Sequence, residues 1–423
     1  MRVLFCLLPL LAAAPALAQG FDPQAATDAY LATVPPEARA RSDAYFEGGY
    51  WIILWGLLYA IGVSALMLFS GYAAAVRNEV SRLVRGRPFP TAFLTILALF
   101  LTAGVLSLPW SWYTEFFREH QYGLSNQTWL AWAKELVLAG LLGSLAMALL
   151  FGVFYALIRR APRVWWAWGA GASVAFLALN MLITPVFLAP LFNEYKPVRP
   201  GPVRDAVLSM ARANGVPAGD VWEFDASRQH DRISANVSGL LGTTRISLND
   251  NLLRRSTAEE VQAVMAHELG HYVLNHIYTL LLMFGLIILG GLFFIDRLFG
   301  AVHRRFGARW GVAGLSDPAG LPLVVALFQI YFTLMTPVTN TIIRGQEAEA
   351  DLFGLNAARQ PDAFATVALK LGQYRKLDPS PLEEFVFFDH PSGRSRILMA
   401  MRFKAEQEGV GEPQLQMGAL HDR

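Results

Sequence analysis

Cysteine is nearly absent from this sequence, whose 423 residues include a single one, Cys6. Charge is scarce as well, because Asp, Glu, Lys and Arg make up 16% of the chain, compared with about 25% in soluble globular domains. The formal net charge is only +2, so composition gives no electrostatic case for a nucleic-acid partner. Hydrophobic residues, at 54%, are in excess instead, and together these figures exclude an ordinary soluble globule.

Long apolar stretches account for this excess and predict a multi-spanning membrane protein, all-α except for a small β element. A helix of about 20 mostly apolar residues crosses a bilayer. Six stretches reach or approach this length, and several are flanked by tryptophans of the kind found at membrane interfaces: 51–72, 91–108, 136–158, 165–191, 277–295 and 321–343. For the short 91–108 stretch, a buried core helix is the alternative.

The N-terminus has the pattern of a secretory signal peptide. Arg2 precedes an apolar run that ends in the small-residue pattern Ala16-Leu17-Ala18. We therefore predict a signal peptide over residues 1–18, with an uncleaved anchor helix as the alternative. Cleavage would remove Cys6, leaving no thiol for a disulfide or a metal site.

Basic loops set the predicted orientation, because positively charged loops stay on the cytoplasmic side of a membrane. Arginines follow the first, third and fifth apolar stretches: Arg77, Arg82, Arg85 and Arg87, then Arg159, Arg160 and Arg163, then Arg297, Arg304, Arg305 and Arg309. The polar segment 192–276 and the tail from residue 344 then share the opposite side with the N-terminus. We expect an integral protein of the bacterial inner membrane whose polar segments, and any active site they carry, face the periplasm.

The spans divide the chain into parts. The predicted order begins with the signal peptide (1–18) and a membrane domain of four spans (19–191). A segment with an edge strand and a metal-binding helix follows (192–276), and then a membrane domain of two spans (277–343) and a C-terminal helical part of the catalytic domain (344–423). A strand is expected at 245–248, where polar and apolar residues alternate, and helices at 347–358, 362–374 and 392–407.

The residues His267-Glu268-Leu269-Gly270-His271 carry the most specific chemical signal. On a helix, residues four apart share a face, so His267 and His271 can bind one metal ion while Glu268 projects beside them. A capping box from Ser256 to Glu259 predicts where this helix begins. The alternative is a pair of histidines that simply pack on a helix face.

A catalytic zinc ion commonly has three protein ligands and leaves one position for water. Without cysteine the third ligand is His, Glu or Asp, and carboxylates follow the sixth span directly, at Glu347, Glu349 and Asp351. We assign Glu347 to the metal and Asp351, one turn later, to fixing the tautomer of a ligand histidine. Glu349 is predicted to be solvated, and the alternative for the whole segment is a solvated acidic face.

These motifs resemble the integral-membrane zinc metalloproteases that include the type I CAAX prenyl endopeptidases and the HtpX-like proteases, and the prenyl branch is the more similar. Besides the two metal motifs, the similar stretches are Leu108-Pro109, 122–128, 185–193, and His390-Pro391 with Arg396-Ile397. The resemblance implies a helical chamber with a gluzincin-type site for one Zn²⁺ per chain, and it places His390 and Arg396 near the substrate carbonyl.

The implied reaction is hydrolysis of a peptide bond in a peptide or protein substrate, with Glu268 as general base toward a metal-activated water. A substrate is expected to lie extended against residues 234–248 by strand addition. Here the chain departs from the family, which has a longer Asn-Ala-aromatic stretch before Gly239, and Asn236 is the predicted substrate-binding residue. In a second departure, the predicted signal peptide stands where the family has its first span.

Other functions remain open at this point. A metal transporter, a catalytically inactive membrane scaffold and an intramembrane-cleaving metalloprotease of the site-2 type are the alternatives. The long polar segment opposes a transporter, the intact Glu268 opposes a scaffold, and charges beside the metal helix, such as Arg254, oppose a site inside the bilayer. Membrane lipid is an expected partner, and the natural substrates are expected to be membrane or secreted proteins. His276 is predicted to be interfacial, with a chamber-facing role as the alternative.

Overall fold

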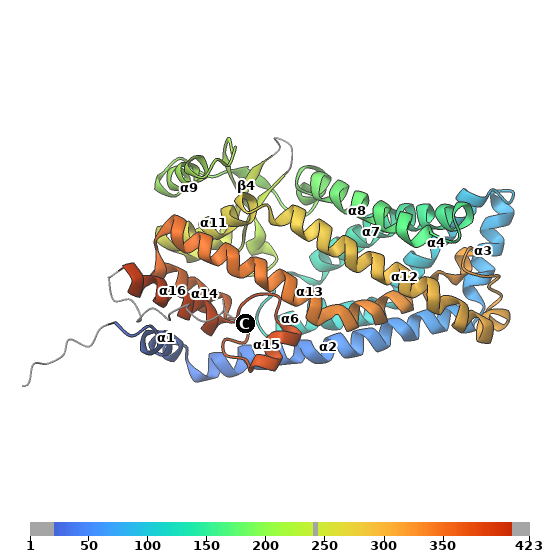
Figure 1. Cartoon of the computed structure of the whole chain (residues 1–423), viewed down its shortest axis with the longest axis horizontal. Coiled ribbons are helices and arrows are strands. Elements are labelled where there is room, and N and C mark those ends of the chain that lie inside the picture. The colour runs from blue at the N-terminus through green and yellow to red at the C-terminus, as the bar shows by residue number, and fades with distance from the viewer. Residues whose placement is uncertain (1–20, 240–243, 408–423) are drawn as a thin grey trace, which may run out of the picture.

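The computed structural model describes residues 21–239 and 244–407, so the predicted signal peptide lies outside the described residues. Figure 1 shows an elongated molecule, along which α2 (Pro36–Phe69), α12 (His276–Trp310) and α13 (Leu321–Ala358) run for much of its length. The helices α9, α11, α14 and α16 gather with the sheet at one end, here called the catalytic end, and α3 and α4 lie toward the other, here called the span end.

The first half of the chain is helical. Its elements are α1 (Pro23–Ala32), α2, α3 (Tyr72–Leu83), α4 (Pro88–Leu106), α5 (Leu108–Ser111), the π-helix η1 (Trp112–Phe117), α6 (Arg118–Gln121), α7 (Trp129–Arg160), α8 (Trp165–Ile183) and the π-helix η2 (Thr184–Leu188). The second half begins with β1 (Tyr195–Pro197), α9 (Pro202–Ala213), β2 (Val221–Phe224), β3 (Ala235–Ser238), β4 (Arg245–Asn249), α10 (Asp250–Arg255) and α11 (Ala258–Val273). After α12 and α13 come α14 (Pro361–Leu371), α15 (Pro381–Phe387) and α16 (Gly393–Gln407).

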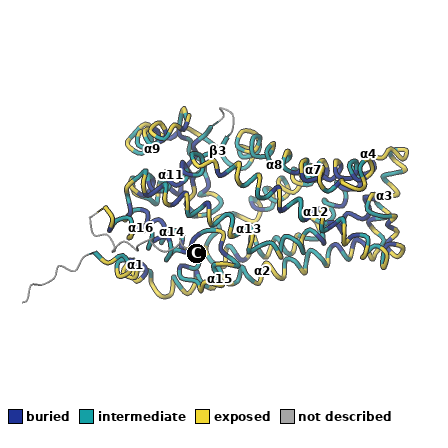
Figure 2. Tube along the Cα trace, viewed as in Figure 1, coloured by how far each residue is buried: buried dark blue, intermediate teal, exposed yellow. Residues whose placement is uncertain are grey.

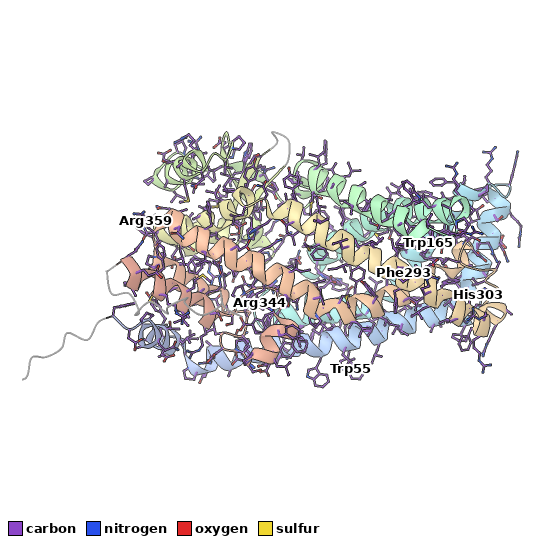
Figure 3. All side chains as sticks on the ribbon, viewed as in Figure 1. Trp55, Trp165, Phe293, His303, Arg344 and Arg359 are labelled. Atoms are coloured by element: carbon purple, nitrogen blue, oxygen red, sulfur yellow. The ribbon has the colours of Figure 1, made fainter. Side chains whose placement is uncertain are left out.

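Six helical segments in the described part of the chain are long and apolar enough to cross a membrane, as predicted, and the 91–108 stretch is among them: Pro36–Phe69, Pro88–Leu106, Trp129–Arg160, Trp165–Leu191, His276–Trp310 and Pro318–Ala358. Their outer surfaces carry exposed apolar side chains, such as Trp51, Leu141 and Leu286. Figure 2 shows buried residues between the helices, and in Figure 3 the side chain of Trp55 projects outward from α2. Apolar side chains on an outer surface are the pattern that a lipid environment favours.

The span end has an apolar core of its own. Ile96, Leu99, Phe151, Trp165 and Leu292 are buried where α4, α7, α8 and α12 pack together. Lipid tails are as apolar as these side chains, so contacts between membrane spans are stabilised by van der Waals packing rather than by removal of apolar area from water. The helices are therefore fixed against one another by the fit of their side chains.

The catalytic end contains a four-stranded sheet with the order β1-β2-β4-β3. The strand β4 fills the predicted 245–248 position and pairs in parallel with β2 and antiparallel with β3. Its Ile246 and Leu248 are fully buried in a second core, together with Val221 of β2 and Met265 and Leu269 of α11. The strand β3 lies at the edge of the sheet and packs against α11, so the sheet supports the metal-binding helix.

The start of α11 corrects one prediction. The capping box is formed by Thr257 and Glu260 rather than by Ser256 and Glu259: the Glu260 amide donates to Thr257 Oγ1 (3.3 Å), and the Thr257 amide donates to Glu260 Oε2 (2.8 Å). Both registers satisfy the pattern in the sequence. Tertiary structure selects the second because Glu260, which is buried, also accepts a hydrogen bond from Lys370 of α14.

The C-terminal helices lie close to their predicted positions. Residues 347–358 form the last turns of the long helix α13, α14 ends at Leu371 rather than at 374, and α16 begins at Gly393. The short helix α15 was not predicted, although Ser380 and Glu383 form a capping box at its start. Together α1, α14 and α16 enclose a third apolar core, which contains Phe364, Ile397 and Met401.

Candidate functional site

Two glycines bring the metal-motif helix α11 against α13. A Cβ atom on Gly354 would lie 3.0 Å from the backbone nitrogen of His267, and one on Gly270 would lie 3.3 Å from the Cα atom of Ala350. Both distances are too short for most side-chain contacts, so glycine permits this close approach. The approach places the carboxylates that follow the sixth span directly opposite the two motif histidines.

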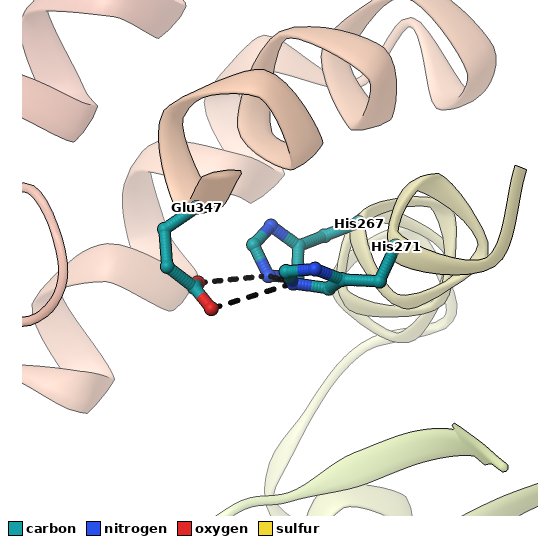
Figure 4. A group of neighbouring side chains, drawn as sticks. All are labelled: His267, His271 and Glu347. Atoms are coloured by element: carbon teal, nitrogen blue, oxygen red, sulfur yellow. Dashed lines mark hydrogen bonds and ion pairs between the residues drawn. The ribbon is translucent and has the colours of Figure 1, made fainter. Parts of the chain in front are cut away.

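Glu347 points toward both histidines from α13 (Figure 4). Its Oε2 lies 3.3 Å from His267 Nε2, its Oε1 lies 3.4 Å from His271 Nε2, and the two Nε2 atoms are 3.1 Å apart. Donors about 2.1 Å from one ion in tetrahedral geometry are about 3.4 Å apart. The two imidazoles and the two oxygens of this carboxylate are thus spaced about as the ligands of one zinc ion are. One ligand atom from each of the three residues lies within 4.8 Å of the others, and all come from groups that zinc commonly binds.

Asp351 and Arg396 hold the outer side of His267. His267 Nδ1 lies 2.8 Å from Asp351 Oδ1, so Nδ1–H donates to the carboxylate and Nε2 is left for the metal. Arg396 of α16 donates from Nε to Asp351 Oδ2 at 2.9 Å, and its Nη2 donates to Oδ1. Since Asp351 is fully buried, this paired guanidinium compensates a carboxylate that would be costly to bury alone.

Protonation of the two histidines differs. Burial opposes a charge on His267, but its hydrogen bonds with Asp351 and Glu347 outweigh burial and raise the pKa of this imidazole to about 10. Burial, together with the charge on His267, lowers the pKa of His271 to about 4. His271 is consequently neutral at pH 7, whereas His267 must release a proton before it can bind a metal ion.

Glu268 lines a cavity of about 220 Å³ together with His267, Glu347, His390 and Arg396. Burial raises the pKa of Glu268 to about 7, against the opposing charge on His267, and the Glu347 carboxylate adds to the rise. A carboxyl group that titrates near neutral pH is suited to accept and return a proton. The cavity is thus lined by a base, two of the three potential metal ligands and two cationic or hydrogen-bonding side chains.

His390 is brought to the same carboxylate by the loop that follows α15. Its Nε2 lies 3.2 Å from Glu347 Oε2, and its Nδ1 lies 2.7 Å from Asp389 Oδ1. The side chain is partly exposed, so it can also contact a molecule in the cavity. Sequence resemblance placed His390 and Arg396 together, but in the structure the Arg396 fork is engaged by Asp351 while His390 faces the metal ligands.

Asn236 lies on the edge strand β3, whose pairing in the described part of the chain is with β4 alone. Its neighbours Ser234 and Ala235 line the cavity, whereas Asn236 does not. Successive side chains of a strand point to opposite faces, so the Asn236 side chain faces away from the side of Ala235. The free edge of β3 therefore contributes backbone groups to the cavity rim rather than this side chain.

His276 lies inside the protein beside the candidate metal ligands, which favours the alternative of a chamber-facing role. It is 3% exposed, and its Nδ1 lies 2.9 Å from His271 Nδ1. Glu349, predicted to be only solvated, has a side chain that is 66% exposed yet lies with its Oε2 3.1 Å from His276 Nε2. The signal that could have indicated this contact is the Asn275 that precedes His276, because asparagine tolerates the left-handed conformation that ends one helix and starts another.

Comparison with known proteins identifies the family. Residues 197–402 match Peptidase family M48, and residues 23–194 match the CAAX prenyl protease N-terminal region with five membrane helices. A metalloprotease of Bacillus subtilis (strain 168), YhfN, described as uncharacterized, is 30% identical over 335 residues, which cover 78% of each chain. The chain belongs to peptidase family M48. This M48 protein is also 27% identical over 342 residues to CAAX prenyl protease 1 of Saccharomyces cerevisiae, covering 75% of this chain and 72% of that one.

A solved structure supports the fold of this M48 protein. The crystal structure of S. mikatae Ste24p superposes with a TM-score of 0.72 and 20% sequence identity, covering 90% of this chain and 95% of that one. The predicted fold class, an all-α multi-spanning fold with a small β element, is confirmed. Family membership shows that the protein is an integral membrane metalloprotease, and it favours a peptidase over a transporter or an inactive scaffold.

Proposed function

We propose that this M48 protein is a zinc endopeptidase in which His267, His271 and Glu347 bind one Zn²⁺ and Glu268 is the general base. The observation that carries the proposal is the convergence of the two Nε2 atoms and the Glu347 carboxylate, with contacts of 3.1–3.4 Å, beside a cavity that Glu268 also lines. When bound, the zinc ion would supply Lewis-acid polarisation of the substrate carbonyl and of a water molecule.

The protein's own groups perform the proton transfers. Glu268 accepts a proton at its carboxylate from the attacking water and delivers it to the nitrogen of the leaving amine. His390 donates a hydrogen bond toward the carbonyl oxygen on which negative charge builds, and losing one such donor typically costs about 3 kcal/mol in the barrier. Arg396 contributes to the same chemistry chiefly through Asp351, which keeps Nε2 of His267 directed at the metal position.

Substrate binding is assigned to the free edge of β3. An extended peptide adds to this edge through backbone hydrogen bonds at 235–236, which places it along the cavity rim. Asn236 then acts on the face opposite the cavity, as a contact for an alternate substrate side chain. Because the strand has four residues, Ala235–Ser238, only a short substrate segment is held in this way.

The location and natural substrates extend this proposal. The arginine-rich loops at the span end support a catalytic end that faces the periplasm from a bacterial inner membrane. In this proposal residues 1–18 are removed as a signal peptide, and the chain is divided at 191, 276 and 343. Membrane or secreted proteins are then the accessible substrates. A reporter enzyme that is active only in the cytoplasm, fused after residue 423, is expected to be inactive, and activity there would reverse the orientation.

The direct test combines elemental analysis with peptide cleavage by the purified protein in detergent. Glu268→Gln is expected to retain one zinc per chain and to reduce cleavage by orders of magnitude, because the amide cannot accept the proton. The matched control is Glu259→Gln, on the first turn of the same helix and outside the cavity, which is expected to retain both zinc and cleavage. Equal cleavage by Glu268→Gln and the parent would remove Glu268 from the mechanism.

A further inference from the structure

His276 reaches the metal centre because the chain changes direction immediately before it. The helix α11 ends at Val273, Asn275 adopts a left-handed conformation with φ of 58°, and α12 begins at His276. On one continuous helix, a residue five positions after His271 would be rotated by about 140° around the axis from it. The turn at Asn275 instead returns His276 to the side on which His271 lies, with the two Nδ1 atoms 2.9 Å apart.

The second nitrogen of His276 has its own partner. Its Nε2 lies 3.1 Å from Oε2 of Glu349, which is on α13 two residues after the predicted metal ligand Glu347. The imidazole of His276 is buried, whereas the Glu349 carboxylate is largely exposed. A continuous series of contacts therefore runs from solvent at Glu349, through His276, to Nδ1 of His271.

Hydrogen-bond chemistry allows one assignment of protons along this series when the imidazoles are neutral. An ionised carboxylate only accepts, so Nε2 of His276 carries its proton and donates to Glu349. The Nδ1 atom of neutral His276 is then an acceptor, and the proton between the two Nδ1 atoms belongs to His271. With Nδ1 of His271 protonated, its Nε2 atom, 3.1 Å from Nε2 of His267, keeps a free lone pair.

We propose that His276 and Glu349 form a positioning relay for His271, fixing the tautomer and ring orientation in which Nε2 is presented to the metal ion. This inference rests on the proposed zinc site. It gives the two histidine ligands different supports: His267 bonds directly to a buried carboxylate, and His271 bonds to an exposed carboxylate through a buried imidazole. Neither His276 nor Glu349 touches the substrate cavity, so both are positioning residues rather than catalytic ones.

The relay is tested by the zinc affinity of the purified full-length protein, measured by competition with a chromogenic chelator. Outer partners of ligand histidines typically change metal affinity by about 10–100-fold when removed, and His276→Leu is expected to weaken zinc binding by this factor. His276→Asn keeps an acceptor oxygen near the place of Nδ1 and is expected to recover most of the affinity. Recovery by asparagine distinguishes the hydrogen bond from a packing role.

Glu349 provides the second arm of the test. Glu349→Ala is expected to weaken zinc binding by less than about tenfold, because water can replace an exposed carboxylate at His276 Nε2. In the His276→Leu background the same change should have no further effect, since the relay is already broken. If His276→Leu does not fold, the comparison of Glu349→Ala with its control and of His276→Asn with the parent decides the question.

Two matched controls are available. His303→Leu removes an imidazole from the other end of α12, and Figure 3 shows His303 far from the catalytic end. Glu79→Ala removes a carboxylate whose side chain is 66% exposed, the same as that of Glu349. Both are expected to keep the parent's zinc affinity.

Each outcome has a defined meaning. Parent affinity in His276→Leu, or an equal loss in His276→Asn and His276→Leu, would overturn the relay. Additive losses in the double variant would also overturn it, because Glu349 would then act independently of His276. If the parent itself bound no zinc, the proposed function would fail first and the relay with it, whereas a zinc-binding parent with unaffected variants rejects the relay alone.

Discussion

Both ends of this molecule have apolar cores, but the catalytic end buries more ionisable side chains than the span end, where Asp317, paired with Arg77, is one example. At the span end, the core where α4, α7, α8 and α12 meet consists of aliphatic and aromatic residues. At the catalytic end, charged or ionisable side chains are buried in the same places where apolar ones would pack, among them Glu260, His267, Asp351 and Arg396. Each of these four has a hydrogen-bonding partner of complementary charge or type.

This difference separates side chains that stabilise the fold from side chains that fix the geometry of the candidate site. An apolar core between membrane spans stabilises a fold through close packing, without specifying one orientation of a functional group. A buried ion pair contributes little net stability, but removing one partner leaves an uncompensated charge. The geometry of the catalytic end therefore depends on each buried charged group keeping its hydrogen-bonding partner, and the span end depends on close packing of its apolar side chains. Four changes test this comparison.

The largest effect is expected from Glu347→Ala, which removes the proposed ligand on α13, opposite the two histidines of α11. Two imidazoles alone hold zinc weakly, so the variant is expected to lose both metal and peptide cleavage. Zinc content by elemental analysis and cleavage of a reporter peptide measure the two losses. A full complement of zinc in this variant would show that the third ligand is assigned to the wrong residue.

Arg396→Met tests the buried partnership. It leaves Asp351 buried without its cation, which should cost about 3–5 kcal/mol of stability and weaken zinc binding at His267. The matched control is Arg394→Met on the same helix, whose partners Asp28 and Asp378 are partly exposed, so its cost should stay below about 1 kcal/mol. Thermal melting in detergent compares the two, and equal melting temperatures would contradict the distinction.

Leu99→Ala tests packing at the span end. Leu99 is 1% exposed, and the cavity left by its truncation should cost about 2–5 kcal/mol. Leu101→Ala on the same helix is the control, because that side chain is 37% exposed on the outer surface. Both variants, once folded, are expected to bind zinc and cleave peptide as the parent does; a specific loss of zinc in Leu99→Ala would show that the two ends are coupled.

The smallest effect is expected from Trp55→Ala. The Trp55 side chain is exposed on the outer surface of α2, as expected for a tryptophan at a membrane interface, and it belongs to none of the three apolar cores described above. Melting temperature, zinc content and cleavage should all remain close to those of the parent. A marked fall in melting temperature would mean that this face of α2 packs against another protein chain.

Much of the site follows from local sequence. Helical periodicity places His267 and His271 on one face, and the apolar stretches give six candidate spans, because both depend on residues close together in the chain. Spacing also placed Glu347 and Asp351 one turn apart, and both lie opposite the histidines. The β3 edge was expected near 234–248, although the direction of the Asn236 side chain required the register with β4.

Contacts between distant segments needed the fold. The sequence alone determined which segments are apolar enough for a membrane and which side chains could ligate a metal, since composition and helical period fix both. Only the tertiary structure decided that the capping box begins at Thr257, that Arg396 pairs with Asp351, and that His276 turns back to His271 and meets Glu349. The physical reason is that the local sequence allows several equivalent arrangements in each case. A partner more than 40 residues away, or the left-handed conformation of Asn275, selects one of them.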